Sequence, residues 1–236
     1  MHIFYFPDIK TNTFLLPEDE SKHAVKVLRL TTGDQVQITD GKGGFYTAVI
    51  QEMQAKNCLL RIVSEQQQYG WRPYNIHVAV APTKNIERLE WFIEKATEIG
   101  VEAISFLLCE RSERKHLNLD RLEKVVVSAM KQSVKAYKPQ LHDLISFKDF
   151  IQEQQPTQTY IAHLAESDQM PLHQVPLTDS VCVLIGPEGD FSPKEIQMAY
   201  AQGIKPITLG TSRLRTETAA LVACHTLNLL HEMQRK

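Results

Sequence analysis

The sequence predicts an α/β protein in two parts, with a small β-barrel over residues 1–70 and a parallel α/β domain over residues 74–236. Three observations support this division. Short runs that alternate polar and apolar residues, separated by turn glycines, fill the first part. Longer apolar runs separated by helical patterns fill the second. Between them, residues 64–73 are polar and contain Gly70 and Pro73, which is typical of a linker.

Turn signals dominate the first part, where Asp-Gly and Gly-Gly pairs separate alternating runs within residues 34–63. Such pairs favour tight hairpin turns. With two further short strands at residues 3–6 and 13–16, the pattern predicts a small antiparallel barrel.

One segment of the first part, residues 17–30, has the spacing of a helix rather than of a strand. Its basic edge could contact nucleic acid or could be an ordinary solvated face, and the segment alone favours neither interpretation. The basic candidates on it are His23, Lys26 and Arg29.

The second part predicts a parallel sheet with helices on both faces, because strand and helix patterns alternate along the chain. The expected strands are apolar, β-branched runs at residues 75–81, 103–109, 159–165, 180–186 and 205–210. The expected helices cover residues 85–99, 120–136, 192–202 and 216–231.

Composition excludes several classes of protein. Of 236 residues, 43% are hydrophobic and 23% are charged, as in ordinary globular proteins. The net charge of −2 provides no overall basic field, so a polyanion would have to bind a local patch. The longest nearly apolar run, residues 218–230, is too short to cross a bilayer, and the first residues show no secretory signal pattern. A cytoplasmic location is therefore expected.

The four cysteines are expected to be reduced core residues, because they lie far apart in the sequence and form no Cys-x-x-Cys pair. The nine histidines show no metal-ligand spacing. No metal site is expected.

Ligands of open α/β sheets bind at the carboxyl ends of the strands. This rule indicates three segments: the loop after residue 165, IGPEGDFSPKE at 185–195, and LGTSRLRTETAA at 209–220. In the second segment, SPKE has the pattern of a capping box that begins a helix at Ser192. The preceding GPEG is then a turn whose glycines let the backbone approach a ligand closely.

That turn alone could equally be a structural connection, since neither nucleotide-binding glycine fingerprint is present. Residues 209–220 repeat the arrangement of strand, glycine and loop before a helix, and add three charged residues that a plain turn does not need. These are Arg213, Arg215 and Glu217. Two such loops at one sheet edge indicate a shared pocket.

One stretch of the second part has a local excess of positive charge that could bind a nucleic acid. Residues 109–138 carry eight Lys or Arg against four acids. A basic surface of this kind can simply keep the protein soluble, or it can bind the phosphate backbone of a nucleic acid. Because Tyr137 is the only aromatic residue in the stretch, base stacking there is expected to be minor.

Six motifs lie in order over nearly the whole chain: HAVKVLRLTTGD (23–34), KATEIGV (95–101), CERSERK (109–115), AMKQSVKAYKP (129–139), IGPEGDFSPKE (185–195) and LGTSRLRTETA (209–219). Together they resemble the RsmE family, the 16S ribosomal RNA uridine N3-methyltransferases of the SPOUT class. The resemblance implies a PUA-like RNA-binding barrel over 1–70. It also implies a SPOUT methyltransferase domain over 74–236, with a trefoil knot at its C-terminal end.

The resemblance further implies that S-adenosylmethionine binds in the knot. The cofactor-binding candidates are Leu184, Ile185, Gly186, Pro187, Glu188, Gly189, Leu209, Gly210, Leu214 and Thr218. Two departures from the family pattern stand out. Asp190 occupies a position where a second glycine is common, and Ser212-Arg213 replaces an arginine followed by an aliphatic residue.

Methylation of uracil N3 requires loss of its proton and in-line attack on the sulfonium methyl group, on a base that is not paired. The catalytic candidates are Arg215, to stabilise the uracil anion or a phosphate, and Glu217, as a base or as the orienter of that arginine. A first-turn acid that interacts with the helix dipole is the plain alternative for Glu217. The RNA-binding candidates are His23, Lys26, Arg29, Arg111, Arg114, Gln132 and Ser133.

The helix over 217–231 is apolar around much of its circumference, which predicts deep burial or subunit contact. SPOUT relatives pair through helices at the knot, so a homodimer is expected, with 16S ribosomal RNA in the small subunit as its substrate. Two rivals remain: a SPOUT enzyme acting on another RNA or on a ribose 2′-hydroxyl, and a non-catalytic RNA-binding ribosome-assembly factor. A phosphate-binding hydrolase is disfavoured because the P-loop lysine is absent.

Overall fold

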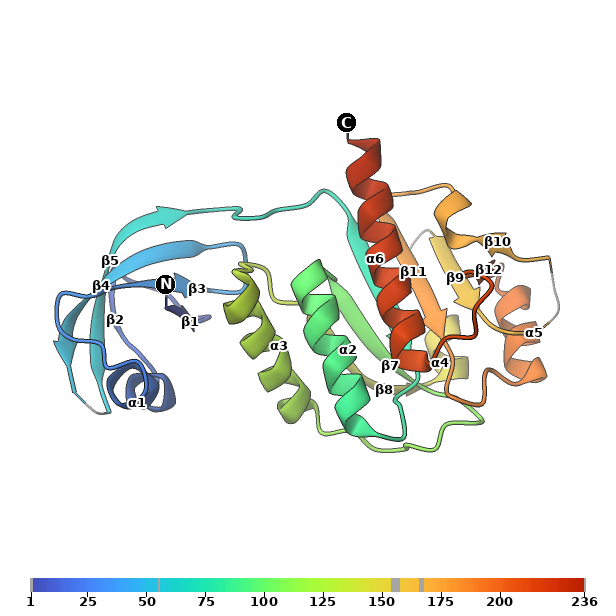
Figure 1. Ribbon diagram of the computed structural model, residues 1–236, viewed down its shortest axis with the longest axis horizontal. Helices are drawn as coiled ribbons and strands as arrows, with labels where there is room; N and C mark the ends of the chain where they lie inside the picture. Colours follow the sequence, from blue (N-terminus) through green and yellow to red (C-terminus); the bar gives the residue numbers. More distant parts are fainter. Residues whose placement is uncertain (1, 55, 154–157, 166–167, 236) are drawn as a thin grey trace. The chain divides into compact units, whose positions relative to one another are not determined.

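The computed structural model describes residues 2–54, 56–153, 158–165 and 168–235, and the chain forms two compact units (Figure 1). Unit 1 comprises Met1–Trp71 and Val127–Lys138, and unit 2 comprises Arg72–Val126 and Pro139–Lys236. The sequence predicted a boundary at residues 70–74, with residues 127–138 in the second domain. In the structure these residues group with unit 1. This grouping has a local cause, because Gly43 N donates to Ala136 O at 2.9 Å and Lys138 N donates to Gly41 O at 2.9 Å.

Unit 1 is built on a five-stranded curled sheet (Figure 1). In sheet order its strands are β1 (Ile3–Tyr5), β3 (Gln35–Thr39), β4 (Phe45–Met53), β5 (Cys58–Gln66) and β2 (Thr13–Leu15). The prediction of an all-antiparallel arrangement is wrong for one pair, since β1 runs parallel to β3. β2 and helix α1 lie between these strands in the sequence, and such a long crossover permits parallel pairing. Two register shifts between β4 and β5 add the local twist that curls a sheet.

Helix α1 (Glu18–Lys26) packs on the core of unit 1. It ends four residues before the predicted boundary at residue 30, because Arg29 adopts a left-handed backbone conformation with φ of 54°. Buried Ser21 ties the helix to the sheet: its hydroxyl accepts from Cys58 N at 3.1 Å and donates to Leu16 O at 3.1 Å. The predicted helical segment is confirmed, in a shorter form.

Unit 2 contains a seven-stranded sheet in which every neighbouring pair is parallel. In sheet order the strands are β10 (Met170–Pro171), β12 (Lys205–Thr208), β9 (Gln158–Ala162), β11 (Ser180–Ile185), β6 (Asn75–Val80), β7 (Ala103–Leu108) and β8 (Gln140–Ser146). The five predicted strands are present. Sequence patterns missed β10, which has two residues, and β8, whose polar His142 and Asp143 interrupt any apolar run.

Helices cover this sheet as predicted. Those of unit 2 are α2 (Ile86–Ile99), α4 (Phe147–Gln152), α5 (Pro193–Ala201), α6 (Thr216–Gln234) and the short 3-10 turn η1 (Leu172–Gln174), while α3 (Leu119–Ser133) is divided between the units. α2 and α6 lie side by side, and α6 packs on β6 and β11 (Figure 1). α4 and α5 enclose a separate buried cluster with Cys182 and Leu184 of β11. The six-residue α4 was missed because it is too short to show a helical period.

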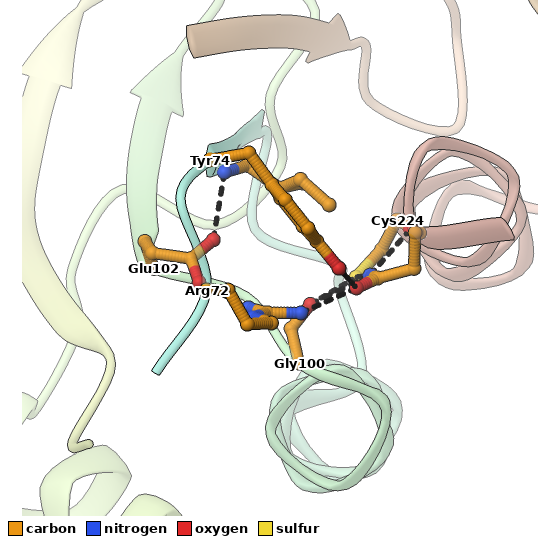
Figure 2. Close-up of polar contacts among 7 residues, drawn as sticks. Arg72, Tyr74, Gly100, Glu102 and Cys224 are labelled. Atoms are coloured by element: carbon orange, nitrogen blue, oxygen red, sulfur yellow. Dashed lines mark hydrogen bonds and ion pairs between the residues drawn. The ribbon is translucent and has the colours of Figure 1, made fainter. Parts of the chain in front are cut away.

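A polar network joins the start of β6 to the end of α2 and to the C-terminal half of α6 (Figure 2). The Arg72 guanidinium donates to Asn228 Oδ1 and to the Glu102 carboxylate, and Glu102 Oε2 accepts from Ile76 N at 2.7 Å. Asn228 Nδ2 donates to Gly100 O at 2.7 Å. Gly100 has a φ of 122°, and a Cβ there would clash with the Arg72 guanidinium, so the position requires glycine. The network anchors the C-terminal half of α6 in unit 2.

The cysteines behave as the sequence indicates. All four are free and buried. Burial raises the pKa of the Cys224 thiol to about 12, so this sulfur stays protonated and unreactive at neutral pH. Across the described residues, no helix combines the length and apolar character needed to cross a membrane.

Candidate active site

A cavity of about 330 Å³ lies where β9, β11 and β12 end, beside the first turn of α6. These three strands are neighbours in the sheet. The lining comprises residues 162–164, 185–188, 190, 207–210, 212–216 and 219. The rule that ligands bind at the carboxyl ends of parallel strands therefore predicted the correct edge. The cavity brings residues from both glycine-containing loops to one edge of the sheet.

Seven of the ten predicted cofactor-binding residues line this cavity. They are Ile185, Gly186, Pro187, Glu188, Leu209, Gly210 and Leu214. The other three do not: Leu184 is fully buried in the cluster under α4 and α5, Gly189 faces Arg111, and Thr218 is not among the lining residues. On α6 the lining residues are Thr216 and Ala219, which share one helix face because they are three residues apart. The role of all ten as cofactor ligands stays a prediction.

Sequence reasoning missed the contribution of β9. The expected loop began after residue 165, but β9 ends at Ala162, and His163 and Leu164 already line the cavity. Part of the predicted loop, residues 166–167, lies outside the described residues. Asp190, treated only as a departure from the family pattern, also lines the cavity.

The GPEG turn is held firmly. A Cβ on Gly186 would lie 3.1 Å from both the ring and the backbone nitrogen of Phe191, so glycine permits this tight packing. Thr216 Oγ1 donates to Gly186 O at 3.1 Å and thereby joins the start of α6 to the turn. The predicted capping box at the start of α5 is confirmed, with Ser192 and Glu195 as its two members. The second oxygen of the buried Glu195 accepts from Glu110 N at 2.9 Å.

Two predicted RNA-binding arginines also hold this region together. Arg111 Nη1 donates to Gly189 O at 2.8 Å. Arg114 donates through Nε to Thr83 O at 3.0 Å and through Nη2 to Lys84 O at 2.6 Å. Because a guanidinium carries five N–H donors, each arginine keeps donors for a further ligand. These side chains therefore have a structural role that the sequence did not indicate.

The two catalytic candidates differ in position. Arg215 lines the cavity at the N-cap of α6 and is exposed. Glu217 does not line it. Its carboxylate is buried, with Oε1 3.8 Å from Arg88 Nε and Oε2 without a hydrogen-bond partner among the described residues. The ion-pair partner that the structure shows for Glu217 is Arg88 of α2, and the role of Glu217 as a base or as the orienter of Arg215 stays a prediction.

His163 is a buried histidine in the cavity wall. Gln169 Nε2 lies 3.2 Å from His163 Nδ1, and His163 Nε2 lies 2.9 Å from the Tyr200 hydroxyl. These two contacts hold the ring in place in the cavity wall. Burial lowers the pKa of His163, which keeps the ring neutral at pH 7. Within the described ranges no group of His, Cys, Asp or Glu is arranged to hold a metal ion.

The remaining RNA-binding candidates belong to unit 1. His23, Lys26 and Arg29 are exposed on and just after α1, and Gln132 is exposed at the end of α3. A 2.7 Å ion pair between Glu20 and Lys131 joins these two helical segments. Four exposed RNA-binding candidates therefore lie on two segments of unit 1 that contact each other. The fifth, Ser133, donates its hydroxyl to Ala129 O at 2.6 Å within the helix.

Comparison with known proteins identifies the family. The family described as RNA methyltransferase domain matches residues 71–228, and the one described as RNA methyltransferase PUA domain matches residues 16–63. Ribosomal RNA small subunit methyltransferase E of Rickettsia conorii is 30% identical over 219 residues, which cover 91% of this chain and 89% of that protein. The chain belongs to the RsmE family of RNA methyltransferases.

Solved structures of RsmE-type proteins share the fold. A probable rRNA-methyltransferase from Porphyromonas gingivalis is 40% identical, with a TM-score of 0.91 over 100% of both chains. Ribosomal RNA small subunit methyltransferase E from Neisseria gonorrhoeae, bound to S-adenosyl methionine, is 26% identical, with a TM-score of 0.86 over 98% of both chains. The fold is thus that of the RsmE family, of SPOUT type, and the family uses S-adenosylmethionine. The trefoil knot implied by the resemblance stays a prediction, since strand order does not define how a chain is threaded.

Proposed function

We propose that this RsmE-family protein transfers the methyl group of S-adenosylmethionine to N3 of a specific uridine in 16S ribosomal RNA. The observation that carries the proposal is the cavity formed by the GPEG turn and the loop at residues 209–215. Both loops are those in which the family resemblance expects the cofactor. The proposed organisation keeps a PUA-like RNA-binding domain over 1–70 and a SPOUT domain over 74–236.

The cavity suits the cofactor in size and chemistry. Its volume of about 330 Å³ falls in the usual range for small-molecule sites. Apolar side chains of Ile185, Ile207 and Leu214 line it beside the backbone of Gly186 and Gly210. Backbone donors and acceptors can bind an adenine edge, while apolar walls contact its faces. When bound, the cofactor supplies an electrophilic methyl group.

The chain itself contributes orientation and positive charge. Two exposed arginines, Arg213 and Arg215, line the cavity. We assign Arg215 the catalytic role of stabilising the negative charge that develops on the uracil when N3 loses its proton. Glu217 then acts as a positioning residue through Arg88, because its carboxylate does not line the cavity. The uridine must be unpaired or extruded to expose N3.

We further propose that the protein acts as a homodimer in the cytoplasm, on RNA within the small ribosomal subunit. Apolar Leu229 and Met233 of α6 are exposed, as is Trp91 of the neighbouring α2. Large exposed apolar side chains on adjacent helices support a subunit contact. The predicted RNA-binding residues of unit 1, together with Arg111 and Arg114, would bind the phosphate backbone. Sedimentation at micromolar concentration should give a dimer, and a monomeric mass would contradict this part.

The test is nucleoside analysis of small ribosomal subunits that lack the modification, after incubation with the protein and S-adenosylmethionine. We expect 3-methyluridine with the wild type and nearly none with Arg215→Ala. A ribose-methylated product would instead identify a SPOUT enzyme of other specificity. Cofactor binding without any methylated nucleoside, on free or assembled RNA, would favour a non-catalytic assembly factor.

A further inference from the structure

Asp190, which directly follows the GPEG turn, has an unusual backbone conformation. Its φ is 63°, in the left-handed region that most side chains avoid. Aspartate and asparagine tolerate this region better than other non-glycine residues, because their short polar side chains form local hydrogen bonds. Glycine would adopt the same conformation without strain. A requirement for positive φ therefore explains why the position accepts either residue, but not what aspartate adds.

What the aspartate adds is a carboxylate that accepts hydrogen bonds from two backbone N–H groups. Asp190 Oδ1 accepts from Phe191 N at 2.8 Å, within its own loop. Asp190 Oδ2 accepts from Leu164 N at 2.9 Å, in the segment that follows β9. Hydrogen bonds to a charged acceptor are stronger than neutral ones. The carboxylate thus joins the ends of two neighbouring strands, β9 and β11, directly at the cavity.

Leu164 has an equally distinctive environment. Its side chain is 61% exposed although it lines the cavity. Contacts hold the backbone before and after it. His163 contacts Tyr200 and Gln169, Leu164 N donates to Asp190, and Ala165 O accepts from Gln169 Nε2 at 3.2 Å. An exposed leucine held at the mouth of a cavity is apolar surface that a bound ligand can cover.

We propose that Asp190 is a positioning residue for cofactor binding, which holds Leu164 at the rim so that its side chain covers part of the bound S-adenosylmethionine. The inference rests on the proposed function, because it requires the cofactor to occupy this cavity. A glycine at position 190 would keep the turn but release Leu164. The carboxylate therefore sets cofactor affinity rather than the chemistry of methyl transfer.

The experiment measures the Kd of S-adenosylmethionine by isothermal titration for wild type, Asp190→Gly, Asp190→Asn, Leu164→Ala and the double variant Asp190→Gly with Leu164→Ala. Loss of a charge-assisted hydrogen bond predicts a Kd about tenfold higher in Asp190→Gly. Asp190→Asn keeps one oxygen acceptor and tolerance of positive φ, so its Kd should lie between these two. Because Asp190 acts through Leu164, the double variant should bind no more weakly than Leu164→Ala alone.

Kinetics separate this role from a general loss of structure. In Asp190→Gly the KM for the cofactor should rise about as much as the Kd, with kcat at saturating cofactor within about twofold of wild type. Thr178→Ala, which removes a hydroxyl that donates to Ser180 O at the start of β11, the end of that strand remote from the cavity, is the control for reduced stability. It should leave the cofactor Kd unchanged.

Each outcome is decisive. Wild-type affinity in Asp190→Gly, or fully additive losses in the double variant, would overturn the positioning role while leaving the proposed function intact. A fall in kcat without a change in Kd would also overturn it. No cofactor binding by the wild type would overturn the cavity assignment itself, and the inference with it.

Discussion

The two loops that form the cavity are held in different ways. The loop at residues 186–192 is fixed from several directions, by Arg111, Glu195 and Asp190. The loop at residues 209–215 has fewer such contacts described, chiefly Thr208 Oγ1 with Gly210 N at 3.2 Å, and four of its residues from Gly210 to Arg213 are exposed in succession. The difference indicates a division of labour, in which the first loop fixes the shape of the pocket and the second presents charge to the substrate.

The largest effect is expected for Arg215, in the loop at residues 209–215. Arg215→Ala should lower kcat about 100-fold or more, as when one group that stabilises developing charge is removed, while the cofactor Kd stays within about twofold. Arg215→Lys should recover only part of the rate, because lysine lacks the planar fork. Single-turnover methylation and titration with cofactor measure the two quantities separately. A large change in Kd with normal kcat would assign both loops the same role.

The second effect concerns the rigidity of the first loop. In Glu195→Gln, the backbone N–H groups of Ser192 and Glu110 both lose a charged acceptor, and one of them then faces an amide NH2 group that cannot accept. Burial of these groups predicts a loss of about 1–3 kcal/mol in the free energy of unfolding. Glu94→Gln, a partly exposed carboxylate on α2, is the matched control and should change stability by less than about 0.5 kcal/mol. Equal effects in urea denaturation would show that Glu195 does not brace the loop.

A smaller effect is expected for Arg111, which touches the first loop from outside. Arg111→Ala should raise the cofactor Kd about fivefold, the order expected for one hydrogen bond to a backbone carbonyl. Arg121→Ala removes an arginine that pairs with Glu90 and should leave the Kd unchanged. If Arg111→Ala alters only RNA affinity, the arginine binds substrate and does not shape the pocket.

The smallest effect is a pH dependence of stability, caused by His163 in the cavity wall. Burial lowers the pKa of His163, so the unfolded chain takes up this proton first as the pH falls. The stability that wild type has over His163→Asn should therefore decrease as the pH falls below about 6.5. Urea denaturation at several pH values checks this, and the use of a difference cancels other histidines such as His77, whose pKa burial lowers to about 4. An advantage that grows toward low pH would contradict the assigned neutral ring.

Much of the fold could be predicted because strands and helices of unit 2 carry strong patterns, and capping residues such as Ser192 act locally. The short α4 and polar β8 have no such signal, and the parallel pairing of β1 with β3 depends on distant contacts. The sheet edge at which the cavity lies could be predicted, because ligands bind at the carboxyl ends of parallel strands. Which residues line it could not be predicted, because Thr218, Glu217 and Leu184 lie next to lining residues in the sequence and only the folded chain separates the two groups. The partners of Arg111, Arg114 and Asp190 are separated from them by up to 80 residues in sequence and depend on the folded chain.

The most direct measurement is titration of S-adenosylmethionine into wild type and Ala219→Trp, which places a large ring on α6 in the cavity wall. Ala201→Trp, at an exposed position on α5, is the matched control. We expect binding by wild type and by the control, and none by Ala219→Trp. Undiminished binding in a folded Ala219→Trp protein would contradict the assignment of the cofactor to this cavity.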